Sequence, residues 1–256
     1  MRSWTIPRAS PCHDYRCHMK LVLAFAFIIL MESSTCVLAK TTSPWSGSAA
    51  LGFSNTTGTF PSLNLNSKDW VRWKSRHWQN RAHVSYNYTA ASTAIYANRL
   101  VLENQSRYFF RPTARYGFVN IRYDRNPFDG YFYHLSEILG EGDVIHLNKA
   151  MTLNVQGGIG ALEDQPIGQK AQTNPAARLA VGYQWHLTPH ATFGESITAL
   201  LSTANNNTYE SVTNLRTRLY GPLALQVSYT ATYNELYLPN YAKLNTITAV
   251  NLVYNF

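Results

Sequence analysis

The sequence predicts a single antiparallel transmembrane β-barrel of about twelve strands, preceded by a cleaved N-terminal signal peptide. Three observations predict this fold class. They are an export signal near the N-terminus, a period-two alternation of apolar and polar residues along the rest of the chain, and an aromatic C-terminal residue. A chain of 256 residues has room for one such barrel or for two small domains.

The export signal is the apolar segment Leu21–Met31, which follows several basic residues. A helix needs about 20 apolar residues to span a bilayer. This run of eleven residues is too short for that and is typical of the hydrophobic region of a secretory signal. Val37 and Ala39 then place compact residues at positions −3 and −1 of a cleavage site before Lys40.

We therefore expect the exported protein to begin at Lys40, with residues 1–39 as the signal peptide and 40–256 as the barrel. Met19 followed by a lysine is a more typical beginning for such a signal, so residues 1–18 are a candidate over-extended start. The alternative is an uncleaved anchor. The intact mass of the exported protein checks this prediction, and a first residue before position 36 would contradict it.

All three cysteines, Cys12, Cys17 and Cys36, lie before the expected cleavage site. Disulfide scaffolds, zinc fingers and thiol catalysis are therefore excluded for the mature chain. Four of the 22 Lys and Arg and two of the 14 Asp and Glu also precede Lys40, which leaves a formal charge of +6. These charges are spread along the chain rather than grouped in runs, so we expect no nucleic-acid partner.

Segments of about ten residues with alternating apolar and polar side chains follow one another through the mature chain, as transmembrane strands require. The first begins at Trp45, and another is Trp78–Tyr88. Two later segments are Ala177–His186 and Leu223–Tyr233, and the last is Val250–Phe256.

Turn-forming residues between these segments predict the strand count. Short turns are expected near 75–76, 111–113, 141–143, 188–190 and 221–222, and longer connections near 55–61, 90–93, 124–130, 163–174, 203–208 and 235–243. Their alternation predicts twelve strands with both termini on the side of the short turns. Bacterial barrels turn that side toward the periplasm, so we expect both termini there.

Two segments fit the alternation poorly. If the apolar residues near 63–65 face lipid, Asp69 falls on the same face, so either a bulge restores the phase or the strand ends early. In the ninth segment Glu195 shares its face with Phe193 and Ile197.

The alternative fold is a soluble β-sandwich, whose strands also alternate but hide their apolar face in a core. Aromatic residues at segment ends favour the barrel, because Tyr and Trp prefer the boundary between bilayer and water. They are Trp45, Trp78, Tyr88, Tyr131, Tyr133, Trp185, Tyr233 and Tyr254. With the export signal, they predict an integral protein of a Gram-negative outer membrane, with membrane lipid and lipopolysaccharide as partners.

Several stretches resemble the YdiY-like family of salt-induced outer-membrane proteins, grouped as domain of unknown function 481. The resemblance covers roughly residues 45–256 and rests on five stretches: Trp45–Gly47, Gly52–Gly58, Tyr123–Tyr131, Tyr183–Thr188 and Leu252–Phe256. It implies an outer-membrane barrel and brings no activity, ligand or catalytic residue.

The sequence shows no motif for an enzyme or a cofactor, so we expect neither. His186 and His190 straddle a strand–turn boundary and are a poor metal pair. Histidines could serve a barrel enzyme that acts on lipids, but none accompanies a Gly-x-Ser-x-Gly motif. Two further alternatives stay open, a narrow channel or envelope-integrity protein and a structural or surface-interaction barrel.

The alternation also predicts which charges lie inside the barrel. The lumen candidates are Lys68, Arg72, Arg99, Glu103, Arg178, Glu210, Arg216 and Arg218. These charges either pair with one another to plug the lumen or form a basic path that prefers anions. At the C-terminus, Leu252, Tyr254 and Phe256 are expected to form the signal read by the barrel-assembly machinery.

Overall fold

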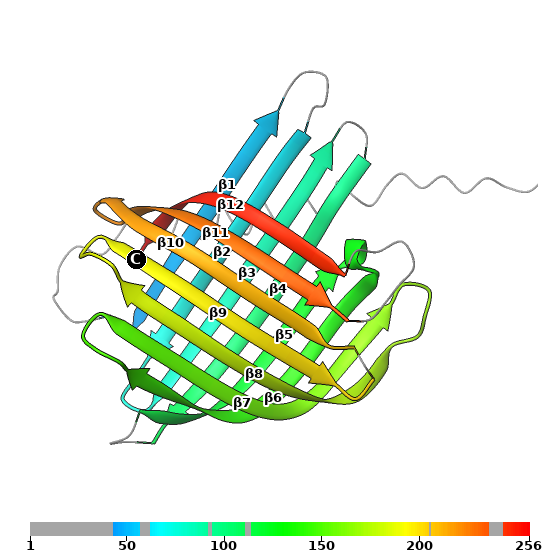
Figure 1. Ribbon diagram of the computed structural model, residues 1–256, viewed down its shortest axis with the longest axis horizontal. Helices are drawn as coiled ribbons and strands as arrows, with labels where there is room; N and C mark the ends of the chain where they lie inside the picture. The colour runs from blue at the N-terminus through cyan, green and yellow to red at the C-terminus, as the bar shows by residue number, and fades with distance from the viewer. Residues whose placement is uncertain (1–42, 57–61, 92–93, 111–113, 205, 236–242) are drawn as a thin grey trace, which may run out of the picture. The chain divides into compact units, whose positions relative to one another are not determined.

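The computed structural model describes residues 43–56, 62–91, 94–110, 114–204, 206–235 and 243–256. Within them the chain forms twelve antiparallel strands that close into one barrel in chain order (Figure 1). The strands are β1 (Trp45–Thr56), β2 (Ser62–Lys74), β3 (Trp78–Ala91), β4 (Ala94–Phe109), β5 (Arg115–Asn126), β6 (Tyr131–His146), β7 (Met151–Pro166), β8 (Gln172–His186), β9 (Ala191–Ser202), β10 (Thr208–Tyr220), β11 (Leu223–Asn234) and β12 (Leu244–Asn255). The expected all-β barrel of about twelve strands is confirmed. The expected signal peptide lies outside the described residues.

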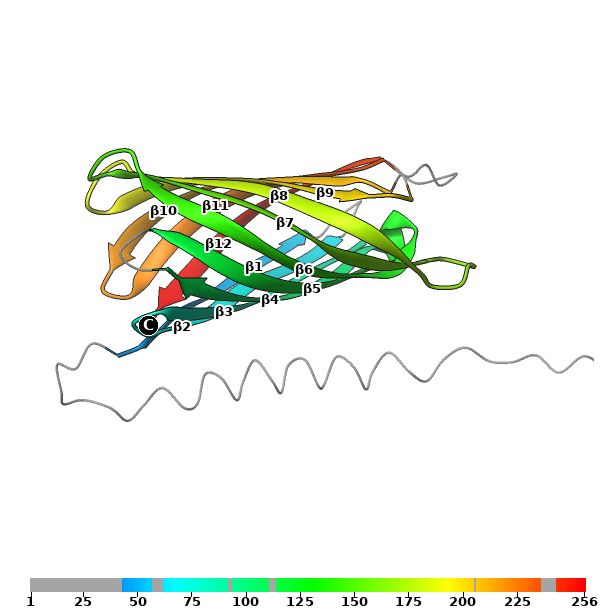
Figure 2. The same cartoon turned by 90° about the horizontal axis from the view of Figure 1, so that it is seen from below.

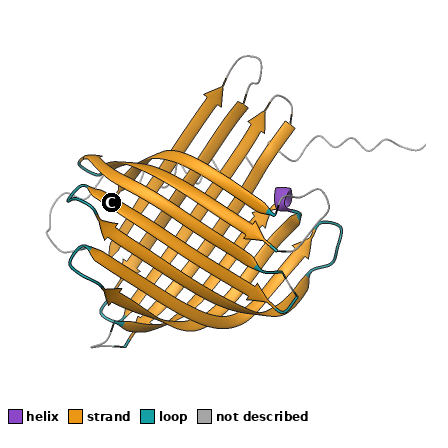
Figure 3. Ribbon diagram, viewed as in Figure 1, coloured by secondary structure: helices purple, strands orange, loops and turns teal. Residues whose placement is uncertain are grey.

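The strands are strongly tilted, so that those of the front wall cross those of the back wall in projection (Figures 1 and 2). Tilt of this kind is needed to close a sheet into a barrel. The short 3-10 helix η2 (Pro127–Asp129) interrupts the connection from β5 to β6 (Figure 3). None of the helices in the described part is long and apolar enough to span a membrane.

The two ends of the barrel differ in what they carry. β1 begins and β12 ends at one of them, which we call the terminal rim. The connections at this rim span 75–77, 110–114, 147–150, 187–190 and 221–222. The opposite end, the loop rim, has connections at 57–61, 92–93, 127–130, 167–171, 203–207 and 235–243. The predicted contrast between short and long connections is therefore weak, although the longest connection does lie at the loop rim.

The turn expected at residues 141–143 was wrong, because these residues lie inside β6 and the chain turns at 147–150. Gly142 is a typical turn residue, but here it lies in the interior of a strand. A Cβ at this position would lie 2.5 Å from the ring of Tyr116, which occupies the space above the glycine. A glycine in a strand often marks such a close approach.

The outer wall of the barrel is apolar. Residues paired across neighbouring strands share a face, so rows such as Leu102, Tyr123 and Leu135 point outward together. Many large apolar side chains on this face are exposed, with Ile159 the most exposed of the aliphatic ones at 73%. One predicted boundary aromatic is an exception: Tyr131 is buried, and its hydroxyl donates to Asn206.

Two carboxylates on the outer wall are held by hydrogen bonds. β2 pairs with β3 in one uninterrupted register, so neither the bulge nor the early end expected around Asp69 occurs. Asp69 instead accepts a hydrogen bond from the backbone N–H of Ala50, where the β1–β2 ladder is interrupted. Glu195 accepts from the hydroxyls of Ser211 and Thr213 on β10.

The barrel closes through a short ladder between β1 and β12. In the described residues these strands pair over Ser48–Leu51 and Leu252–Asn255. The C-terminal residue adds one more pair, because the N–H and C=O of Phe256 both bond to Gly47, at 3.0 and 2.9 Å. Leu252 and Tyr254 face outward.

Part of the interior is filled by apolar side chains. Tyr116, Phe118, Ile138 and Leu162 form a buried cluster on the inner face of β5, β6 and β7. These side chains take up part of the space inside the barrel.

Candidate functional site in the barrel lumen

The lumen of the barrel is lined by polar and charged side chains whose position follows from the register. His83, Glu103 and Arg122 are cross-strand partners on β3, β4 and β5 and point inward in one row. Similar rows place a set of bases in the lumen. They are Lys68, Arg72, Arg81, Arg99, Arg107, Arg122, Arg178, Arg216 and Arg218. The lumen carboxylates in the described residues are Glu103, Asp124, Asp164 and Glu210.

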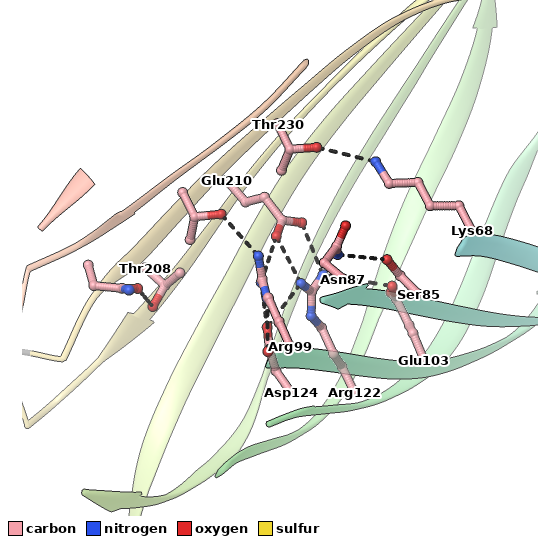
Figure 4. Close-up of polar contacts among 12 residues, drawn as sticks. Lys68, Ser85, Asn87, Arg99, Glu103, Arg122, Asp124, Thr208, Glu210 and Thr230 are labelled. Carbon is pink, nitrogen blue, oxygen red and sulfur yellow. Dashed lines mark hydrogen bonds and ion pairs between the residues drawn. The ribbon is translucent and has the colours of Figure 1, made fainter. Parts of the chain in front are cut away.

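Five of these charges form a network that we call the lumen bridge (Figure 4). Arg99 donates to Asp124 at 2.5 Å and to Glu210 at 3.2 Å. Arg122 donates to Glu210 at 2.9 Å, lies 3.5 Å from Asp124 and 3.8 Å from Glu103. These side chains are only 10–22% exposed, so the ion pairs are little screened by water.

The lumen bridge joins opposite walls. Arg99 and Arg122 come from β4 and β5, whereas Glu210 comes from β10 across the interior. Two neighbouring contacts also cross the lumen: Lys68 donates to Thr230 at 3.3 Å, and Gln105 donates to Gln156 at 3.0 Å. The barrel interior is therefore constricted at the level of the bridge.

The space beside the bridge is small. A cavity of about 70 Å³ is lined by the bridge residues together with residues of β6–β11. A larger cavity of about 310 Å³ lies beyond it toward the loop rim. Asn87, Arg99 and Thr246 are among the residues of β3, β4 and β12 that line it.

The other half of the lumen, toward the terminal rim, holds arginines with neutral partners. Arg72 donates to Ser46 at 3.1 Å. Arg107 donates to Gln105 at 2.9 Å, and Arg216 donates to Gln226 at 2.8 Å. In the described part of the chain, none of these arginines forms an ion pair. The electrostatic field in this half is therefore positive.

The register places all eight lumen charges expected from the sequence on the inner face. The bridge brings together three of them, Arg99, Glu103 and Glu210. Sequence reasoning missed Asp124 near the end of β5, because the expected loop began at residue 124, and it also missed Arg122, which precedes that loop. It also missed Arg81, although this residue alternates with the apolar residues of Trp78–Tyr88 and therefore already belonged to the polar face of that segment.

The histidines do not form a metal centre. His186 Nδ1 lies 3.2 Å from the hydroxyl of Thr192, and His190 lies in the β8–β9 turn. Among the residues that the structure describes, no group of three or more His, Asp or Glu is placed to hold a metal ion.

Comparison with known proteins identifies a family. The model of the family described as "Protein of unknown function, DUF481" matches residues 49–256, so the resemblance seen in the sequence is confirmed. No curated protein matches the chain.

The chain is also similar to several solved barrels. The NanC porin is 10% identical, with 82% of this chain and 98% of that chain covered and a TM-score of 0.49. An outer membrane channel from Pseudomonas putida F1 is 10% identical, with 85% and 97% covered and a TM-score of 0.48. The translocator domain of the autotransporter NalP from Neisseria meningitidis is 9% identical, with 93% and 97% covered and a TM-score of 0.46. These are similarities of the backbone and do not bear on what the chain binds.

Proposed function

The chain belongs to the DUF481 family, whose function is not known, and from this premise we propose that it is an outer-membrane barrel that conducts small anions through a narrow, charged lumen. The observation that carries the proposal is the excess of lumen arginines over lumen carboxylates. The lumen bridge would be the constriction of this pathway, and the arginines on its terminal side would select for negative charge.

The apolar outer wall supports a place in the membrane. A closed barrel satisfies its backbone hydrogen bonds without water, as a bilayer requires. An Arg or Lys on the lipid face near the bilayer midplane costs about 2–4 kcal/mol, and the arginines discussed above face the lumen instead. We place both termini in the periplasm, following the usual orientation of bacterial barrels, with lipid and lipopolysaccharide around the wall and the assembly machinery as a transient partner.

A second candidate is a structural barrel that maintains envelope integrity and conducts nothing. The contacts that cross the lumen favour it, because Arg99, Arg122 and Glu210 hold opposite walls together and leave little free space beside them. The two candidates differ in one measurable property, which is whether ions pass.

We expect purified protein in a planar bilayer to show small conductance steps with a reversal potential that indicates anion preference in a salt gradient. Replacing Arg216, which lies in the lumen, by glutamate should lower this preference, because it reverses one charge along the path. Arg115→Gln is the matched control, since Arg115 is an exposed residue at the terminal rim. Cation preference, or no conductance at all, would remove the channel and leave the structural barrel.

A further inference from the structure

We propose that the half of the lumen next to the terminal rim is a binding site for a compact oxyanion with at least two negative charges, of the phosphate type. Its arginines are Arg72 on β2, Arg81 on β3, Arg107 on β4 and Arg216 on β10, which we call the arginine vestibule. Each lies within a few residues of the strand end at the terminal rim. The inference deepens the proposed anion pathway and rests on it only for the direction from which the ligand approaches.

Arg81 lies close enough to the other three vestibule arginines to be repelled by each of them. Arg72 and Arg81 are direct cross-strand partners on the inner face. Arg81 is attracted by Glu103 and repelled by Arg107, by Arg72 and, from the opposite wall, by Arg216. Guanidinium groups stay charged in proteins, so this arrangement costs free energy that a bound anion would recover.

No carboxylate in the described part of the chain compensates these charges through an ion pair. Glu103 attracts Arg81 and Arg107 electrostatically but forms its ion pair with Arg122, and Glu210 is also bound by Arg122 in the lumen bridge. The vestibule arginines rest instead on aromatic faces. The guanidinium carbons of Arg72 and Arg81 lie 5.7 and 5.0 Å from the ring centre of Trp70. Contacts of this kind hold an arginine in place without using its hydrogen-bond donors.

A fifth arginine, beside the lumen bridge, has a buried donor without a partner. Arg178 on β8 is only 8% exposed, and its Nη1 has no hydrogen-bond partner. A buried polar group left without a partner costs free energy, and the cost is larger when the group is charged. Arg178 lines the small cavity beside the lumen bridge, where Glu103, Arg122 and Glu210 act on it more strongly than Arg107 does, so its free donor lies between the bridge and the vestibule.

The inner face between Arg107 and Arg178 carries one large side chain and two glycines in a single row. One inward row runs from Arg107 through Phe118, Gly140 and Gly158 to Arg178. A Cβ on either glycine would meet neighbouring backbone, at 2.1 Å for Gly140 and 2.6 Å for Gly158. Phe118 therefore lies next to Arg107 in this row, and no side chain of the row lies between Phe118 and Arg178.

These features specify the ligand chemistry. Planar guanidinium groups bind oxyanions through paired hydrogen bonds, and several converging cations favour a ligand with more than one negative charge. A neutral sugar or a cation gains nothing from this arrangement. Approach from the terminal rim is direct, because the lumen bridge obstructs the way from the loop rim.

Trp70 provides a direct readout, since it lies against two of the vestibule arginines. We expect sodium pyrophosphate to cause a saturable change in tryptophan fluorescence of the folded barrel in detergent at constant ionic strength. Chloride should produce no saturable change over the same range. Trp70→Phe should remove most of the signal, and calorimetry should still detect binding to this variant.

Variants locate the site. Arg81→Gln should weaken pyrophosphate binding at least tenfold, and Arg81→Lys, which keeps the charge but loses the paired donors, should give an intermediate loss. Arg115→Gln should change it less than twofold, because this arginine is exposed at the rim. The heat-modifiable band on unboiled gels verifies that each variant is folded. If Arg81→Gln does not fold, the affinities of Arg81→Lys and of the wild-type protein for pyrophosphate are compared instead.

The site is overturned by absence of saturable binding to wild-type protein, or by equal affinity in the folded Arg81 variants. Binding without conductance would support the site and remove the channel. Conductance without saturable binding would support the channel and remove the site. The two proposals can therefore fail separately.

Discussion

Deletion of Phe256 is expected to remove most of the folded, heat-modifiable form of the protein. In the described residues, β1 and β12 pair over only four positions on each strand besides the Phe256–Gly47 pair. The deletion takes away both backbone hydrogen bonds of that pair. An unsatisfied backbone group in lipid costs several kcal/mol, and the loss falls on the shortest ladder of the barrel.

The ring of Phe256 has a separate role that two substitutions isolate. It lies against the terminal part of β1, where a Cβ on Gly47 would come within 2.4 Å of it. Phe256→Ala keeps the backbone pair and loses the ring, so we expect refolding in detergent to persist and assembly in cells to fall. Phe256→Tyr should assemble nearly as the parent does. An unchanged band after deletion of Phe256 would contradict the closure described here.

Replacing Glu210 by alanine is expected to lower the free energy of unfolding by about 3–5 kcal/mol, the usual cost of removing one partner from a buried ion pair. Glu210 receives donors from both Arg99 and Arg122 and is the only bridge carboxylate that comes from β10. Without it, two buried guanidinium groups share Asp124 and Glu103, and the tie between opposite walls is lost. Urea unfolding of the barrel in lipid vesicles measures the change.

The same variant separates the two candidate functions. If the bridge is the constriction of a channel, Glu210→Ala should raise both the single-channel conductance and the anion preference. Asp143→Asn is the control. The Arg115–Asp143 pair is separated by 3.8 Å, with side chains 75% and 42% exposed, so its loss should cost less than about 1 kcal/mol. A Glu210→Ala barrel as stable as the control would contradict the structural role of the bridge.

Several features of the site could be predicted from the sequence because they depend only on whether a residue falls on the inner or the outer face of its strand. In a strand, side chains alternate between two faces, so Arg72, Arg99 and Arg216 follow from the apolar residues beside them. Arg81 was available on the same grounds. Parity fails near strand ends, where the boundary is uncertain by a few residues, and this is why Asp124 was expected in a loop.

The partners of these charges could not be found in the same way. Glu210 contacts Arg122, which is 88 positions away in the sequence, and Arg99, which is 111 positions away. Which inward residues meet across the lumen depends on strand tilt and on how far the interior is filled. The apolar cluster around Tyr116 and Phe118 fills one side of it. The alternation of apolar and polar residues gives neither the strand tilt nor the filling of the interior.

The sequence by itself determined the fold class, the number of strands and the inner or outer face of most side chains, because each depends on local alternation between turns. Only the tertiary structure decided that Gly142 belongs to a strand and that Asp69 meets the backbone of β1. It alone divides the lumen into a paired bridge and an unpaired arginine vestibule. The physical reason is that ion pairs form between groups that the closed barrel brings within about 4 Å, and closure is a property of all twelve strands together.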